Sequence, residues 1–274
     1  MAQQNMEYLR LTRAELKERF KAGRMPTEED FMSLIDSMVN AMDEGFVVSE
    51  ENGLEIKQKK DNGKLASFFA NLAEHQPLWF LNTRKNAEKK ETALNLKTAT
   101  MRANESAVSV VNEISDESSE EPARVRVGIG SADPRSELDV NGLVSCKGRI
   151  GYEDKNYEVW ADGKWYDVTD VLTGCQCFEI VAGVGGVDGD GRFALAHAIA
   201  TNVFNRRPRV RMTQSFSGWR GAKIDIRWHR CKNKYDYTLQ IRTRHKYDKK
   251  QLVKVSYRLT KLWYDTQMVN SIVK

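Results

Sequence analysis

The chain has 274 residues, of which 41% are hydrophobic and 30% are charged. This composition is ordinary for soluble domains, and the length allows one large domain or two smaller ones with their own cores. The sequence has no apolar run near the ~18 residues that span a bilayer, and its first twenty residues are too polar for a signal peptide. We therefore expect no membrane span and a protein that is cytoplasmic during its assembly.

The net charge of +5 is unevenly distributed along the chain. Residues 205–274 contain 19 Lys and Arg against four Asp, a net charge of +15, which leaves −10 for the remainder. Such a split predicts that the two parts meet different partners, or meet each other across subunits.

The pattern of residues divides the chain into three regions. Residues 1–48 are predicted to form a helical attachment segment, residues 49–151 a β-rich stem, and residues 152–274 a C-terminal head. The expected fold class is mainly β with a small helical N-terminus, an intertwined trimeric β stem and a β-sandwich-like head.

Two helices are predicted in the first region. Thr12 and Glu15 form the T-x-x-E pattern of a capping box, and Gly23 suits the end of that helix. Thr27 caps a second helix, which we expect to end at Gly45. The apolar residues of the second helix fall on one stripe, which is a candidate for attachment to a larger assembly: Phe31, Leu34, Ile35, Met38, Val39 and Met42.

The stem contains short strand-like segments that have one apolar face and no obvious covering layer. An uncovered face or edge of this kind promotes aggregation, and winding three identical chains together would bury it. The residues that share this face near the end of the stem are the candidates for trimerisation: Val125, Val127, Ile129, Leu138, Val140, Val144 and Ile150.

The head is predicted to be all-β. Apolar and polar residues alternate around residues 193–199, 224–228, 235–241 and 253–259, at the spacing typical of a sandwich. Asp162 and Gly163 are expected to form a hairpin turn between Trp160 and Trp165.

The segment VGIGSADPRSELDVNG, residues 127–142, resembles the VGIGT-x-x-P-x-x-KLDVNG segment of phage tail fibres and trimeric adhesin-like fibres. Ser131 stands where Thr is usual and Glu137 where Lys is usual. Further segments, among them LASFFANLAEHQPLWFLN and CQCFEIVAGVGG, are similar to baseplate-associated fibre proteins of phage-tail-like contractile injection systems. The resemblance implies a homotrimeric structural protein whose partners are baseplate or shell subunits of a particle that ends outside the cell or anchored to it.

No residue pattern predicts catalysis. Cys175 and Cys177 with Cys231 could be imagined as zinc ligands, but C-x-C is not the usual spacing of a zinc knuckle. His197 lies among apolar residues and is interpreted as a core histidine rather than a catalytic base. We therefore expect no catalytic residue, no metal site and no cofactor.

The glycine-rich segment GVGGVDGDG lacks the Gly-Lys-Ser/Thr of a phosphate-binding loop. Asp188 and Asp190 within it could bind Ca²⁺ weakly, but a long hairpin turn is the favoured interpretation. A pair of carboxylates for glycoside hydrolysis would be visible only in three dimensions.

The basic part of the chain offers candidates for surface binding. They combine arginines at alternating positions with a tryptophan: Arg207, Arg209, Arg211, Trp219, Arg242 and Arg244. Alternation is typical of the outward face of a strand, so nucleic acid is an unlikely partner. Two functions stay open: assembly into a peripheral shell, or binding of a cell-surface glycan or another anionic surface as a receptor-binding fibre.

Overall fold

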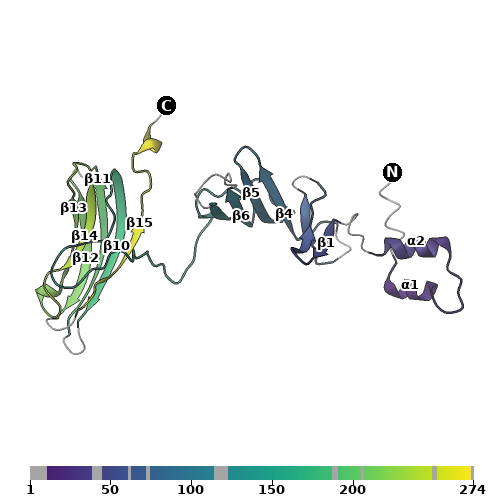
Figure 1. Ribbon diagram of the computed structural model, residues 1–274, viewed down its shortest axis with the longest axis horizontal. Helices are drawn as coiled ribbons and strands as arrows, with labels where there is room; N and C mark the ends of the chain where they lie inside the picture. Colours follow the sequence, from purple (N-terminus) through teal and green to yellow (C-terminus); the bar gives the residue numbers. More distant parts are fainter. Residues whose placement is uncertain are drawn as a thin grey trace. The chain divides into compact units, whose positions relative to one another are not determined.

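The computed structural model describes residues 11–38, 45–60, 63–71, 75–113, 123–186, 191–204, 207–248 and 252–272 (Figure 1). The chain divides into two compact units, Met1–Ser145 and Cys146–Lys274. The fold is mainly β, with two short helices near the N-terminus, as the sequence predicts. None of the described helices is long and apolar enough to cross a membrane.

Helices α1 (Arg13–Arg19) and α2 (Glu28–Asp36) each begin with a capping box. The predicted box of Thr12 and Glu15 is confirmed, and Thr27 forms a second one with Asp30. In both, the threonine hydroxyl accepts a backbone N–H, and the carboxylate accepts the backbone N–H of the threonine. The rings of Phe20 and Phe31 meet edge to face at 5.4 Å between the two helices.

Helix α2 is shorter than predicted, because it ends at Asp36. The hydroxyl of Ser37 donates to the carbonyl of Ser33 at 2.6 Å and accepts the N–H of Leu11, which gives the helix end side-chain partners. Two residues of the predicted stripe, Val39 and Met42, lie outside the described residues.

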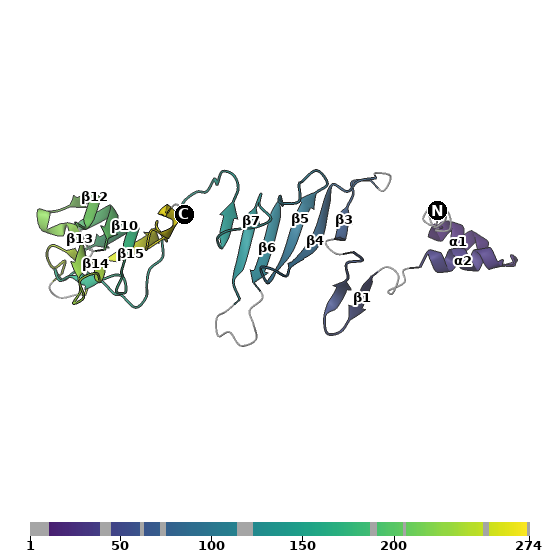
Figure 2. The ribbon, with the colours of Figure 1, turned by 90° about the horizontal axis from the view of Figure 1, so that it is seen from above.

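The stem contains a hairpin and a six-stranded sheet. The hairpin pairs β1 (Phe46–Ser49) with β2 (Gly53–Ile56). The sheet has the order β3-β4-β5-β6-β7-β8, and Figure 2 shows β3 to β7 side by side. All its pairs are antiparallel except β7 with β8, and its strands are β3 (Lys64–Phe68), β4 (Trp79–Asn86), β5 (Glu91–Thr98), β6 (Val108–Glu113), β7 (Val125–Ile129) and β8 (Leu138–Val140).

The head consists of two sheets that share one core. One sheet has the order β12-β11-β10-β15 and the other β13-β14-β9. The strands are β9 (Tyr166–Asp167), β10 (Cys175–Gly185), β11 (Phe193–Val203), β12 (Arg209–Ser217), β13 (Ile224–Arg230), β14 (Tyr237–Thr243) and β15 (Ser256–Lys261). Two 3₁₀ turns, η1 (Arg220–Ala222) and η2 (Val269–Ser271), complete the unit.

The core of the head contradicts the interpretation of His197 as a core residue. On β11 the alanines at 194, 196, 198 and 200 are buried, whereas His197 points outward and is exposed. The small side chains leave room for large ones on neighbouring strands, such as Phe178, Ile180 and Tyr257, which are almost fully buried. The histidine instead contacts Glu179, at 2.9 Å between Nε2 and Oε1.

The predicted hairpin at Asp162 and Gly163 is also wrong. A turn is present, with φ of +90° at Gly163 and the Asp162 carboxylate accepting the N–H of Lys164. Its two flanks do not pair with each other, because Trp160 bridges to Lys254 and β9 pairs with β14. The predicted loop residues Asp188 and Asp190 lie outside the described residues.

Candidate interaction surfaces

One face of the stem sheet is polar and is covered by the chain's own loops. On β5 the side chains of Glu91, Asn95 and Lys97 are buried on this covered face. The Lys97 ammonium donates to the carbonyls of Arg102 and Ala103 at 2.9 and 3.1 Å. Burial lowers the pKa of Lys97 from its ordinary value.

The loop between β7 and β8 closes over the same face. The Ser109 hydroxyl donates to the carbonyl of Ser131 at 2.7 Å, and the Arg84 guanidinium donates to the carbonyl of Ala132 at 3.0 Å. This approach requires Gly128, since a Cβ there would lie 2.4 Å from the Ser131 carbonyl oxygen. The glycine of the VGIG segment therefore allows the loop to cover the sheet.

A buried ion cluster lies under these loops. Arg126 pairs with Glu91, and the two side chains are only 11% and 8% exposed. A second carboxylate, Glu113, lies 3.4 Å from the same guanidinium. The covered face thus combines buried charge and hydrogen bonds with the buried apolar side chains of Ala93, Val111 and Ala132.

The opposite face of the stem sheet, the open face, is apolar and uncovered. One row in register crosses all six strands: Ala66, Leu81, Leu96, Val108, Ile129 and Val140. A second row joins Leu94, Val110, Val127 and Leu138. Ile129 is 45% and Leu138 60% exposed, so no layer of the described stem buries this face.

The open face contains five of the seven candidates for trimerisation, namely Val125, Val127, Ile129, Leu138 and Val140. The other two, Val144 and Ile150, were expected on strands, and this is wrong. Strand β8 ends at Val140, and both residues are exposed in a segment that belongs to no strand. Sequence reasoning missed the contributions of β4, β5 and β6, although the alternation in ETALNLKT was a usable signal.

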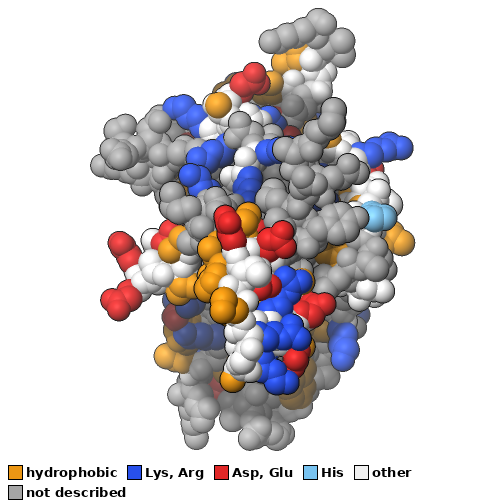
Figure 3. Space-filling view, turned by 90° about the vertical axis from the view of Figure 1, so that its right-hand side faces the viewer, with side chains coloured by type: hydrophobic (Ala, Val, Ile, Leu, Met, Phe, Trp, Pro, Cys, Tyr) orange, Lys and Arg blue, Asp and Glu red, His pale blue; other side chains and the backbone are white. Residues whose placement is uncertain are grey.

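The helical pair also exposes apolar side chains. Phe31, Ile35 and Met38 are exposed, and Leu34 is half-buried. Figure 3 shows hydrophobic side chains at the surface among acidic and basic ones. Attachment through these residues stays a prediction.

The basic candidates of the head lie on two different faces. Arg209 and Arg211 point outward from the four-stranded sheet, opposite Thr201 and Ile199 of β11. Arg207 precedes β12 with φ of +58°. These three arginines are separated by the core from the remaining candidates.

The second basic group lies around the three-stranded sheet. Arg242 and Arg244 both pair with Asp225, at 3.2 and 3.0 Å. The guanidinium groups of Arg227 and Arg242 lie over the ring of Trp165, at 4.0 and 4.4 Å from its centroid. This stack escaped sequence reasoning because its members are far apart in the chain.

Trp219 is the last of the candidates for surface binding. It is exposed, and its ring lies against that of His245 at 4.6 Å between centroids. The six candidates therefore form no single patch, and most of their charge is already paired or solvated.

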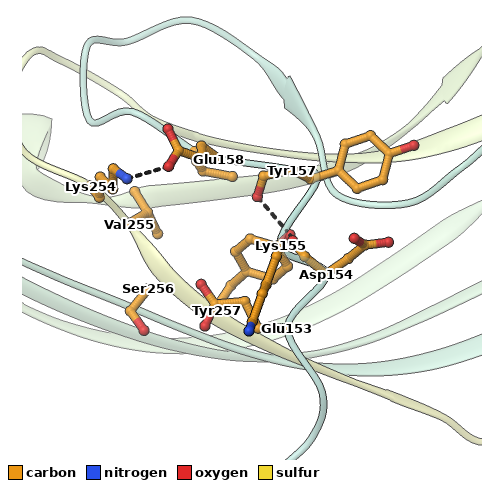
Figure 4. A pocket seen from close by; sticks show the side chains of 10 residues that line it. Glu153, Asp154, Lys155, Tyr157, Glu158, Lys254, Val255, Ser256 and Tyr257 are labelled. Atoms are coloured by element: carbon orange, nitrogen blue, oxygen red, sulfur yellow. Dashed lines mark hydrogen bonds and ion pairs between the residues drawn. The ribbon is translucent and has the colours of Figure 1, made fainter.

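A polar pocket of about 310 Å³ lies between residues 153–159 and β15 (Figure 4). Two of its three carboxylates pair with cations, Glu158 with Lys254 and Glu153 with Arg258, and the Asp154 carboxylate accepts the backbone N–H of Asn156 at 3.0 Å. The hydroxyl of Tyr257 donates to the backbone carbonyl of Tyr157 at 2.9 Å and closes one side. These contacts hold the loop on the strand.

The side chain of Tyr157 points away from the pocket in Figure 4. Its hydroxyl donates to Asp170, and this hydrogen bond raises the pKa of Tyr157 to about 12. The phenol is therefore protonated at neutral pH.

Two thiols of the head, those of Cys177 and Cys231, are poor nucleophiles. Burial raises the pKa of Cys177 and of Cys231, so both are protonated at neutral pH. In the part of the chain that the structure describes, no three His, Cys, Asp or Glu side chains lie together in a way that could hold a metal ion.

Comparison with known proteins does not assign the chain to a family. No protein-family model matches the chain, and no curated protein matches its sequence. The interpretation of its function therefore depends on the surfaces described above.

Proposed function

We propose that the chain is a structural subunit that forms a fibre-like homotrimer, in which the open faces of three stem sheets meet. The supporting observation is the open face itself, a continuous apolar surface across six strands. Burying one Val, Leu or Ile side chain contributes roughly 1.5–3 kcal/mol. Left uncovered, a surface of this size would aggregate, so a partner must cover it.

A copy of the same chain is the partner that fits best. The two rows across the open face consist of Ala, Val, Leu and Ile, with Thr83 on β4, so identical copies can meet along these rows without opposing like charges. The one cation beside them is Lys85 of β4, in the next described row with Thr92, Asn112 and Val125. A closed ring of three also leaves no apolar surface to recruit further chains.

The particle in which such a trimer would work is a phage-tail-like contractile injection system, where we place the protein at the baseplate periphery. The support is the resemblance of residues 127–142, which form β7, the covering loop and β8. The protein would assemble in the cytoplasm and end in a particle outside the cell or anchored to it. The helical pair would attach it, so Ile35→Asp with Met38→Asp should prevent co-purification with particles.

The head has two possible roles in this setting, and we favour assembly into a shell over receptor binding. The charge of +15 in residues 205–274 would bind nucleic acid of the producing cell unless an acidic partner covered it. A receptor role predicts salt-sensitive binding of isolated trimers to target-cell envelopes, whereas a shell role predicts salt-sensitive association of trimers with one another. In neither role does the proposal include catalysis.

The experiment that tests the proposal measures mass in solution. Light scattering coupled to size exclusion should give three times 31.4 kDa for the intact chain. Val110→Asp with Val127→Asp places two charges in the open face and should give a folded monomer. Val171→Asp with Leu252→Asp, at exposed apolar positions of the head, is the matched control and should remain trimeric.

A monomeric intact chain at micromolar concentration would contradict the proposal. A trimer that persists in the Val110→Asp, Val127→Asp variant would show that chains associate through another surface.

A further inference from the structure

The outward face of β11 in the head carries the large side chains of that strand. Phe193 and Leu195 are 58% and 60% exposed, while the alanines between and beyond them are buried. We call these two residues the head ridge. Large apolar side chains that a well-packed domain leaves in water mark an interaction surface.

Small residues flank the head ridge on both sides. Strand β10 presents Gly183 and Gly185 beside it, and β12 presents Ser215 and Ser217. A hollow of about 670 Å³ is lined by the two ridge residues with Gly185, Ser215 and Ser217, and also by Val184, Ala194 and Phe216 of the inward-facing rows. A ridge between two strips of small residues can interlock with an identical ridge from another copy.

The part of this face that contains the head ridge is uncharged, which favours contact with an identical copy. The two cross-strand rows that contain the head ridge hold Gly, Phe, Leu and Ser, and no charged residue. The following rows carry His197, Glu179 and Arg211. Because residues 146–274 carry a net charge of +11, copies of the head repel one another unless they meet through an uncharged surface.

The connection from the stem enters the head on this same side. Arg149 pairs with Glu179, whose side chain points outward from β10. Tyr152 then bridges to Leu259 on β15, at the edge of the four-stranded sheet.

The area of the stem alone is small for a stable assembly. Six strands of about five residues give an open face on the order of 500 Å², at ~4.8 Å between strands and ~3.3 Å per residue. Stable interfaces bury about 800 Å² per partner. The two uncharged rows of the head, across β10, β11, β12 and β15, add on the order of 250 Å² by the same spacings.

From these observations we infer that the head ridge is a second contact between copies of this chain, through which three heads pack together around the trimer axis. The inference rests on the proposed homotrimer and adds to it a surface in the other unit of the chain. It also assigns a role to the inverted pattern of β11, where the small residues face the core and the large residues face a neighbouring head.

Cysteine cross-linking in the full chain tests this inference. In a Cys146→Ser background, which removes an exposed thiol, Leu195→Cys places a thiol on the head ridge. His229→Cys, exposed on the outward face of the three-stranded sheet, is the matched control. Mild oxidation at low micromolar concentration should link up to about two thirds of the Leu195→Cys chains into dimers, because one thiol of every three is left over in a closed trimer. The His229→Cys chains should give at least tenfold less dimer.

The mass of each variant before oxidation separates the two proposals. A trimer that cross-links through neither cysteine, or equally through both, would overturn the head contact and leave the stem trimer standing. A monomer would overturn the proposed function, and the head contact with it. A trimer that cross-links at Leu195→Cys alone supports both.

Discussion

The stem sheet and the head bury opposite kinds of face. In the head, the alanines of β11 and the aliphatic residues of β13 and β14 form one buried core between the two sheets. In the stem sheet, the polar face is the covered one, and the apolar face is open. The head therefore buries a hydrophobic core within one chain, whereas the described stem leaves its apolar face exposed.

The stem sheet and the head also differ in how exposed their ion pairs are. The stem buries Arg126 and Glu91 beneath loops, whereas Lys254 and Glu158 of the head are about half exposed. Buried charges that lose a partner are costly, and exposed pairs contribute little. These two pairs are therefore expected to contribute very differently to the stability of their units.

The largest effect expected from this comparison follows the loss of Arg126. Arg126→Met leaves Glu91 buried without its cation, which should lower the free energy of unfolding by roughly 3–5 kcal/mol. Urea unfolding at a fixed protein concentration measures this. Arg126→Met with Glu91→Leu replaces both charges by apolar groups and should recover much of the loss. If Arg126→Met alone were as stable as the intact chain, the ion pair of Arg126 and Glu91 would be solvated rather than buried.

Local signals in the sequence account for the parts of the helical segment and of the stem that were predicted correctly. The capping box at Thr12 and the alternation from Val125 to Ile129 each depend on residues a few positions apart. The full extent of the open face depends on the pairing of six strands, which no local pattern specifies. The segment with Val144 and Ile150 keeps an apolar pattern but has no partner strand within the described chain, so its prediction as a strand failed.

The second effect tests the packing of the head. Ala198→Leu adds volume beneath β11, where the alanine is 1% exposed, and should lower the free energy of unfolding by about 1–3 kcal/mol. Thr201→Leu, which adds an apolar side chain on the outward side of the same strand, is the control and should change it by less than about 0.5 kcal/mol. Equal effects of the two variants would mean that the inward and outward sides of β11 do not differ in packing.

The same strand explains why the candidate sites of the head were harder to predict. Alternation locates β11 but does not say which of its two faces is inward, and the larger residues were taken as the core. Which face of β11 is turned inward depends on Phe178 and Tyr257, which come from other strands and fill the space next to the alanines. The contact of His197 with Glu179 and the stack of Trp165 with two arginines likewise join residues far apart in sequence.

The smallest effect concerns the exposed pair of Lys254 and Glu158. Lys254→Met keeps an unbranched apolar stem near the ring of Trp160, over which the ammonium lies at 4.8 Å, and removes only the charge. Because both side chains are about half exposed, at 51% and 52%, the free energy of unfolding should fall by at most about 1 kcal/mol. Salt near 1 M should reduce the difference further, since the Debye length is then about 3 Å. Urea unfolding of the variant and the intact chain at low and high salt gives the comparison. A loss as large as that of Arg126→Met, unchanged by salt, would mean that the head depends on its ion pairs as the stem does.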